Sequence, residues 1–219
     1  MSDMRFFGKY AICRSENKST GAHLIGPDNI VGNEVSLDFR NTDGKTVVWA
    51  VNKFGADIGY FDKQTSYLID VTRSRGWKLH ALISIIGLTD YIENNPEENG
   101  YYWAEIAVIS FAPRYEDYAE KFLGVISKNL ANGVRFEIDL VSSSIDLLLK
   151  NKGDWTPSKK LPQPPKKKGT VIIKKSRKPS ETAIEAGRNR NKGCYFVSYL
   201  FIALLIIGII FLIKAILGF

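Results

Sequence analysis

The sequence contains few of the residues that carry enzymatic or metal chemistry. Its 219 residues include two cysteines, Cys13 and Cys194, and two histidines, His23 and His80, which lie far apart in the chain. Two cysteines cannot form a disulfide framework, and no spacing of His, Cys, Asp and Glu suits a metal. The glycines do not form a phosphate-binding loop, and no G-x-S-x-G or Cys/His pattern occurs. The sequence therefore predicts a protein without metal or cofactor that is not an enzyme.

The N-terminal residues also lack the apolar core of a secretory signal. A long apolar run occurs at the other end instead, where residues 195–213 read YFVSYLFIALLIIGIIFLI without a charge. About 20 apolar residues in a helix cross the ~30 Å hydrocarbon core of a bilayer. We therefore expect a transmembrane helix within residues 194–219 and a single-pass, tail-anchored membrane protein. A helix buried in a protein core is the alternative.

Charge is distributed unevenly along the chain. Residues 1–150 carry 16 Lys and Arg against 20 Asp and Glu, a net charge of −4, whereas residues 151–193 carry 13 against 3, a net charge of +10. Positive charge before the apolar run indicates that the N-terminal domain is cytoplasmic. We expect the basic segment to contact lipid headgroups of the bilayer. The candidate residues for this contact are Lys174, Lys175, Arg188, Arg190 and Lys192.

The first 150 residues combine strand patterns with helical ones. Val35, Leu37 and Phe39 alternate with polar residues, which predicts a half-buried strand over 34–40. Further strands are expected over 5–14, 45–52, 57–61, 77–92 and 101–112, with an edge strand over 169–175 that docks back on the body. Helices are expected over 62–75, between Asp62 as N-cap and Gly76 as C-cap, over 114–131, and from Ser144 to 149.

These elements predict an α+β fold, in which a small, bent antiparallel sheet or barrel carries one to three helices. We expect a barrel domain over 1–112 and a helical extension packed on it over 113–150. A Pro- and Lys-rich juxtamembrane linker over 151–193 then leads to the membrane anchor over 194–219.

One stretch of the predicted barrel carries a recognisable pattern. A strand with Leu37 leads through an Asn/Asp turn at Asn41 and Asp43 to a second strand, and the chain then reads G-A-D-I-G-Y over 55–60. With the helix and glycine turn that follow, residues 35–84 resemble the HIRAN domain. The resemblance implies a small β-barrel. Some members of that family bind the 3′ end of single-stranded DNA through an aromatic–Asp pair in this turn, where the present chain has Thr42 before Asp43.

Basic and aromatic residues also occur close together around Gly76. Arginine beside aromatic rings is a common way to hold single-stranded nucleic acid, although rings in the core and charges in solvent are the alternative. The candidate ligand-binding or nucleic-acid-binding residues are Asp43, Tyr60, Arg73, Arg75, Trp77 and Lys78.

The sequence thus predicts a membrane-tethered, cytoplasmic, HIRAN-like binding module that recruits a protein partner or single-stranded nucleic acid to the membrane. Two alternatives remain. The protein could be a structural subunit of a membrane complex without nucleic-acid binding. It could also be an unrecognised hydrolase, for which a pocket that gathers Asp43, Asp57 and His80 would be required.

Overall fold

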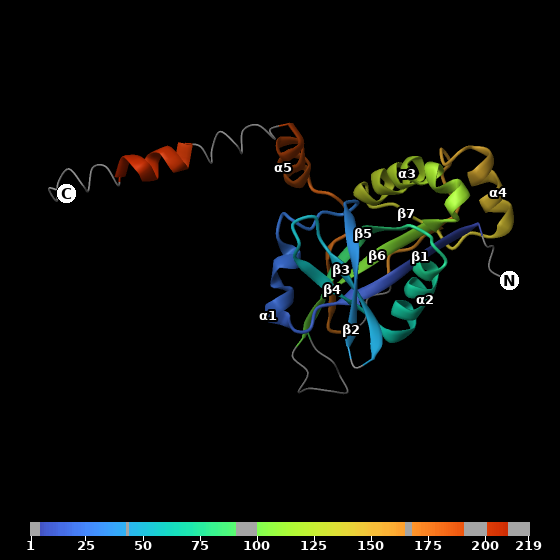
Figure 1. Cartoon of the computed structure of the whole chain (residues 1–219), viewed down its shortest axis with the longest axis horizontal. Helices are drawn as coiled ribbons and strands as arrows, with labels where there is room; N and C mark the ends of the chain where they lie inside the picture. The colour runs from blue at the N-terminus through green and yellow to red at the C-terminus, as the bar shows by residue number, and fades with distance from the viewer. Residues whose placement is uncertain (1–4, 43, 91–99, 165–167, 191–200, 210–219) are drawn as a thin grey trace. The chain divides into compact units, whose positions relative to one another are not determined.

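The computed structural model describes residues 5–42, 44–90, 100–164, 168–190 and 201–209 (Figure 1). The chain divides into two compact units, Met1–Arg177 and Lys178–Phe219. The first unit is an α+β domain, and its organising element is an antiparallel sheet of seven strands in the order β2-β3-β4-β1-β6-β5-β9. The strands are β1 (Phe6–Arg14), β2 (Glu34–Thr42), β3 (Lys45–Val51), β4 (Asp57–Phe61), β5 (Leu79–Thr89), β6 (Tyr101–Phe111) and β9 (Thr170–Lys174).

The sheet closes on itself because β2, at one end of the strand order, also pairs with β5. Six strands therefore form a ring, and β9 pairs with β5 as an additional strand. Both β2 and β9 pair with β5, β2 near its beginning at Ala81 and Leu82 and β9 towards its end, from Ile86 to Thr89. A closed ring removes most of the exposed strand edges that an open sheet presents.

Helices and short strands complete the first unit. They are α1 (Lys18–Gly21), η1 (Ala22–Ile25), α2 (Lys63–Ser74), η2 (Pro113–Tyr118), α3 (Ala119–Ala131) and α4 (Ser142–Lys150), with β7 (Arg135–Phe136) paired to β8 (Lys160–Leu161). The second unit contains α5 (Pro179–Arg190) and a helical stretch over 201–209.

The barrel interior is filled by the apolar side chains that alternate along its strands. Val35, Val48 and Ile58 are each almost fully buried, as are Ile83 and Ile106. α3 adds a second part of the core, because its Phe122 contacts Phe6 and Phe111 edge to face at centroid distances of 5.8 and 6.1 Å. Aromatic pairs in this geometry add to the stability that comes from burying the rings.

The predicted strands over 5–14, 34–40, 45–52, 57–61, 77–92 and 101–112 are confirmed as β1 to β6. Asp62 is the N-cap of α2, where its carboxylate accepts hydrogen bonds from the backbone N–H (2.9 Å) and the hydroxyl (2.8 Å) of Thr65. Gly76 follows the helix with a φ of +77°, which a glycine adopts readily. Cys13 is buried, and burial raises the pKa of its thiol to about 12.

The sheet and the set of helices are larger than predicted. The segment 151–193, expected as a linker that includes an edge strand, supplies β8, β9 and α5. The edge strand expected over 169–175 is confirmed as β9, which pairs with β5. These residues join the fold because β5 extends beyond its pairing with β2 and leaves an edge that β9 can cover.

The predicted membrane-spanning helix requires correction. Residues 201–209 are helical. The rest of the predicted span, 195–200 and 210–213, lies outside the described residues. In the part of the chain that the structure describes, no helix is both long and apolar enough to cross a membrane. This finding overturns the predicted transmembrane helix and the single-pass membrane localisation derived from it.

A buried ion pair joins the barrel to the segment that follows α3. Arg135 in β7 donates to both carboxylate oxygens of Glu105 in β6, at 3.0 and 2.7 Å, and the Ser84 hydroxyl donates to the same carboxylate at 2.8 Å. Both charged side chains are only 8% exposed. Because charges taken out of water are costly unless paired, each residue depends on the other.

Replacing Arg135 by methionine should lower the free energy of unfolding by about 3–5 kcal/mol, since it leaves the Glu105 carboxylate buried without its partner. Urea denaturation followed by circular dichroism measures this loss. The double variant Glu105→Met/Arg135→Met is the control and should recover most of the stability. A single variant as stable as the wild type would contradict the prediction.

Candidate functional site

A row of aromatic and basic side chains crosses the outer face of the barrel. Trp49 on β3 lies opposite Tyr60 on β4, and Tyr60 lies opposite Arg14 on β1. Their neighbours Ala50, Phe61 and Cys13 are buried. Since successive side chains in a strand point to opposite faces, the register places Trp49, Tyr60 and Arg14 side by side on the outside.

The rings and the guanidinium in this row contact one another. The centroids of Trp49 and Tyr60 are 5.2 Å apart and their planes are inclined by 47°. The Arg14 guanidinium lies 5.4 Å from the centre of the Tyr60 ring and 5.5 Å from that of Tyr101 on β6. Arg14 Nε also donates to the Tyr60 hydroxyl at 3.1 Å. Arg14 is therefore positioned between two rings, and all three side chains are fixed relative to one another.

These four residues line a groove of about 810 Å³. Its other charged residues are Lys45, Lys63, Glu16 and Asp62. Burial acts to raise the pKa of the Asp62 carboxyl, but its hydrogen bonds from Thr65 prevail and the pKa lies below the usual value. Because this carboxylate is already engaged in capping α2, the basic residues Arg14, Lys45 and Lys63 are the charges best placed to meet a ligand.

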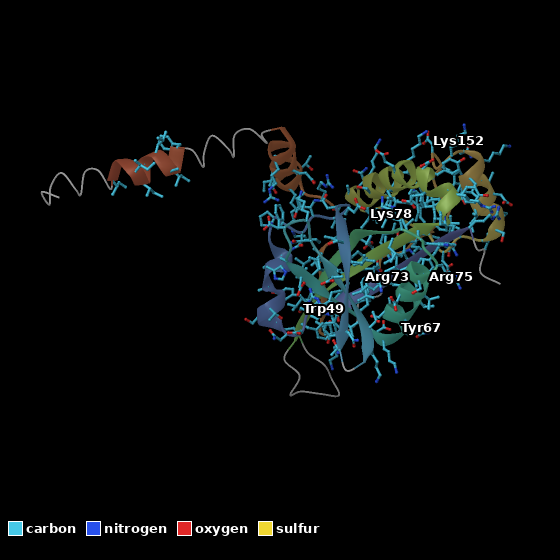
Figure 2. The ribbon with its side chains drawn as sticks, viewed as in Figure 1. Trp49, Tyr67, Arg73, Arg75, Lys78 and Lys152 are labelled. Atoms are coloured by element: carbon cyan, nitrogen blue, oxygen red, sulfur yellow. The ribbon has the colours of Figure 1, made fainter. Side chains whose placement is uncertain are left out.

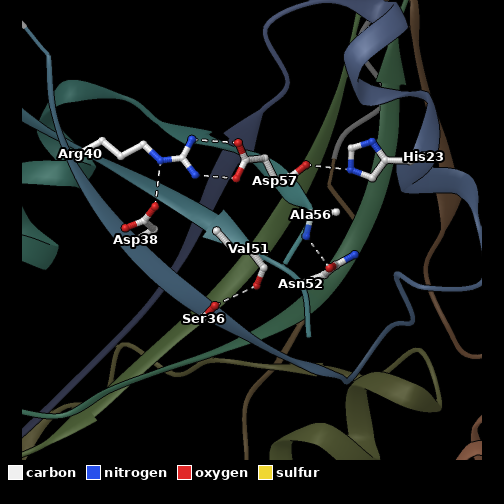
Figure 3. A network of polar contacts seen from close by, with 8 residues as sticks. All are labelled: His23, Ser36, Asp38, Arg40, Val51, Asn52, Ala56 and Asp57. Atoms are coloured by element: carbon white, nitrogen blue, oxygen red, sulfur yellow. Dashed lines mark hydrogen bonds and ion pairs between the residues drawn. The ribbon is translucent and has the colours of Figure 1, made fainter. Parts of the chain in front are cut away.

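Trp49 is supported on its other side by Arg40 of β2. The Arg40 guanidinium lies 4.5 Å from the centre of the Trp49 ring. It donates to both carboxylate oxygens of Asp57 at 2.8 and 2.6 Å, and through Nε to Asp38 at 2.9 Å (Figure 3). Two carboxylates thus hold Arg40 against the indole, which fixes the orientation of Trp49.

The same network continues into the β3–β4 turn and η1. His23 Nε2 donates to the backbone carbonyl of Asp57 at 2.7 Å, which requires that this nitrogen carries a proton. Asn52 is buried, and its side-chain carbonyl accepts from the backbone N–H groups of Phe54 and Ala56, both at 3.0 Å. β4 and its Tyr60 are therefore positioned by hydrogen bonds as well as by sheet pairing.

The structure separates the residues that the sequence proposed as one site. Tyr60 lies in the groove, whereas Arg73, Trp77 and Lys78 line a second cleft at the end of α2. Figure 2 shows Trp49 apart from Arg73, Arg75 and Lys78. Arg75 is exposed and caps the end of α2. Asp43 lies outside the described residues.

Trp77 does not lie in solvent, because only 8% of it is exposed. Its ring therefore presents little surface to a ligand. The interpretation that the rings near Gly76 belong to the core fits this residue, whereas Tyr67 on α2 is 67% exposed and lines neither cleft.

The basic residues expected to meet lipid headgroups are placed differently from one another. Lys174 is buried in β9, and its ammonium donates to the backbone carbonyls of Gly26 at 2.7 Å and Asn29 at 2.9 Å. This position is structural and not available to a headgroup. Lys175 is exposed, while Arg188 and Arg190 belong to α5. Lys192 lies outside the described residues.

Sequence reasoning missed Arg14, Arg40, Trp49 and Tyr101. Each of the four directly precedes or follows an inward-facing residue in a predicted strand. The alternation of side chains along a strand therefore already places them on an outer face. Alternation within one strand does not reveal how strands that are distant in sequence align with one another, such as β1 with β4 and β1 with β6. Without it, four single residues do not combine into a site.

Of the three residues that the hydrolase alternative requires, Asp57 and His80 are each engaged by other side chains, and Asp43 lies outside the described residues. Asp57 is engaged by Arg40, whereas His80 on β5 lies between Glu34 and Glu116, at 3.3 and 2.8 Å. Among the described residues no group of His, Cys, Asp and Glu could hold a metal ion.

The ion pair between Arg40 and Asp57 should change the pH at which the Asp57 carboxyl titrates. Hydrogen bonding from Arg40 lowers the pKa of the Asp57 carboxyl below its usual value of 3.8. Because the folded-state pKa is depressed, the pair contributes stability above about pH 4 and loses it as the pH falls through the folded-state pKa. A carboxyl-carbon NMR titration should therefore give Asp57 a midpoint below 3.8. In Arg40→Gln the midpoint should rise; an unchanged midpoint would show that Arg40 does not control this carboxylate.

Comparison of the chain with protein-family models, with curated proteins and with solved structures found no match.

Proposed function

We propose that the barrel is a binding module for single-stranded nucleic acid and that the strand lies in the groove formed by Arg14, Trp49, Tyr60 and Tyr101. The observation that carries the proposal is the continuous row in which an arginine lies between two tyrosines beside a tryptophan. Proteins hold single strands by stacking bases on aromatic side chains along a positively charged groove. The resemblance of residues 35–84 to the HIRAN domain supports the same class of ligand.

The basic residues of the groove supply the second requirement. Arg14, Lys45 and Lys63 are on its lining and can meet the phosphates of a strand whose bases stack on Trp49 and Tyr60. Three phosphate contacts to a single strand give a slope of about −2 for the logarithm of affinity against the logarithm of salt concentration. We expect modest affinity, because Glu16 and Asp62 also line the groove.

The proposal does not require catalysis. The groove offers rings, guanidinium and ammonium groups, and it contains neither histidine nor cysteine among its lining residues. A structural role in a larger assembly, without nucleic-acid binding, is the competing proposal. Co-purification of a stoichiometric subunit together with no oligonucleotide binding would favour it.

Fluorescence anisotropy with a labelled oligothymidylate of about eight nucleotides tests the proposal. Trp49→Ala should weaken binding about tenfold or more, since stacking of one base contributes roughly 1–3 kcal/mol. Tyr60→Ala should act similarly, whereas Tyr60→Phe keeps the ring and should retain most of the affinity.

Tyr67→Ala is the control, because it removes an exposed tyrosine that lies outside the groove. It should bind like the wild type. Absence of saturable binding by the wild-type protein, or binding that does not change with salt, would refute the proposal. Equal losses in Trp49→Ala and Tyr67→Ala would place the strand elsewhere.

A further inference from the structure

The ring of strands is closed along only a short part of one seam. β2 pairs with β5 through Glu34–Leu82 and Val35–Ala81, although β2 continues to Thr42 and β5 begins at Leu79. Beyond Val35, no strand in the described part of the chain pairs with this edge of β2. The two strands therefore diverge and leave a strand edge without a partner strand.

The free edge of β2 directs backbone hydrogen-bonding groups into the opening between β2 and β5. The backbone N–H of Ile83 donates to the carbonyl of Asn33 at 3.0 Å across the closed part of the seam. In an antiparallel strand the backbone groups of every second residue face the same edge. By this alternation, the N–H and C=O groups of Leu37 and Phe39 face the opening, where a further strand could pair with them.

A cleft of about 620 Å³ lies along this edge. Its apolar lining comes from both sides of the seam: Val35, Leu37 and Phe39 lie on β2, Leu79 is the first residue of β5, and Trp77 lies just before it. An extended peptide that adds to a sheet gains main-chain hydrogen bonds from the edge and specificity from pockets for alternate side chains. The cleft provides both features in one place.

The charged residues of the cleft are mainly basic. Lys53, Arg73 and Lys78 line it together with a single carboxylate, Glu34. Arg73 is held by Asp70 at 2.8 Å and lies over the Phe39 ring, with its guanidinium 3.6 Å from the ring centre. The guanidinium is thus fixed beside the apolar residues of the cleft. There it can bind a carboxylate of a ligand that also places an apolar side chain in the cleft.

We propose that this cleft binds an extended acidic peptide, which adds to β2 as an antiparallel strand. Apolar side chains of the peptide contact Leu37 and Phe39, and its carboxylates lie near Arg73 and Lys78. The site goes beyond the proposed nucleic-acid groove, because it shares none of the residues that line that groove. The protein would then join two ligands, one on the outer face of the barrel and one at its open seam.

The test uses the full chain and two fluorescein-labelled heptapeptides, Glu-Val-Asp-Ile-Glu-Val-Asp and Lys-Val-Lys-Ile-Lys-Val-Lys. The acidic peptide should bind saturably in an anisotropy titration, and the basic one should not. Binding of neither peptide up to about 1 mM, or equal binding of both, would overturn the proposal.

Methylation of the peptide backbone tests the strand addition itself. Two versions of the acidic peptide carry N-methyl groups on alternate amides, one on the even positions and one on the odd. Since only every second amide faces β2, one version should lose binding and the other should keep it. Equal effects of both versions would show that the peptide does not pair as a strand.

Variants locate the peptide in the cleft. Arg73→Gln/Lys78→Gln should weaken the acidic peptide by about tenfold, from the loss of two charged contacts. Lys121→Gln, an exposed lysine of α3 outside the cleft, is the matched control and should bind normally. Trp49→Ala should also bind the peptide normally, so that failure of the nucleic-acid groove and failure of this cleft are distinguishable.

Two other occupants give different results. A second copy of the chain would produce dimers in sedimentation analysis that Arg73→Gln/Lys78→Gln abolishes. Nucleic acid would displace the acidic peptide when oligothymidylate is added. Either result would overturn the assignment to an acidic peptide.

Discussion

The structure depends on how β5 is paired. This strand joins β6 along one edge, while its other edge pairs first with β2 and then with β9. The pairing with β2 closes the ring, and closure gives each strand one apolar face inside and one face outside. Beyond Val35, the edge of β2 that faces β5 has no partner strand among the described residues. The open seam with its cleft and the closed outer face with its groove therefore both follow from one arrangement of strands.

Closure also explains why the aromatic groove is preorganised. Trp49, Tyr60 and Arg14 are neighbours because the register of three adjacent strands places them in one row. Arg40, held by Asp38 and Asp57, then fixes the indole from β2. Side chains that are ordered before a ligand arrives lose less conformational entropy on binding. The groove therefore offers fixed stacking surfaces, while the exposed ion pairs around it contribute to orientation more than to stability.

Local patterns in the sequence predicted much of the fold. The alternation of Val35, Leu37 and Phe39 gave β2, and Asp62 and Gly76 marked the ends of α2, because capping and alternation are short-range effects. Contacts between distant segments could not be predicted from the sequence. Lys174 was expected at the surface, yet it is a buried residue of β9 whose ammonium donates to two backbone carbonyls. The predicted membrane-spanning helix failed because hydropathy alone decided it. Of the candidate residues that the structure describes, only Tyr60 lines the groove, since its companions there come from strands whose register is not encoded locally.

In the proposed complex, the outer face of the closed barrel, and not its open seam, receives the bases of a single strand. The most direct measurement is a two-dimensional NMR titration of the isotope-labelled full chain with a short oligothymidylate, with the indole N–H of Trp49 assigned from a Trp49→Phe sample. The signals of Trp49, Tyr60 and Tyr101 should shift together and saturate, while those of Leu37 and Phe39 stay unchanged. Shifts confined to Leu37, Phe39 and Trp77, with the Trp49 indole unmoved, would contradict this expectation.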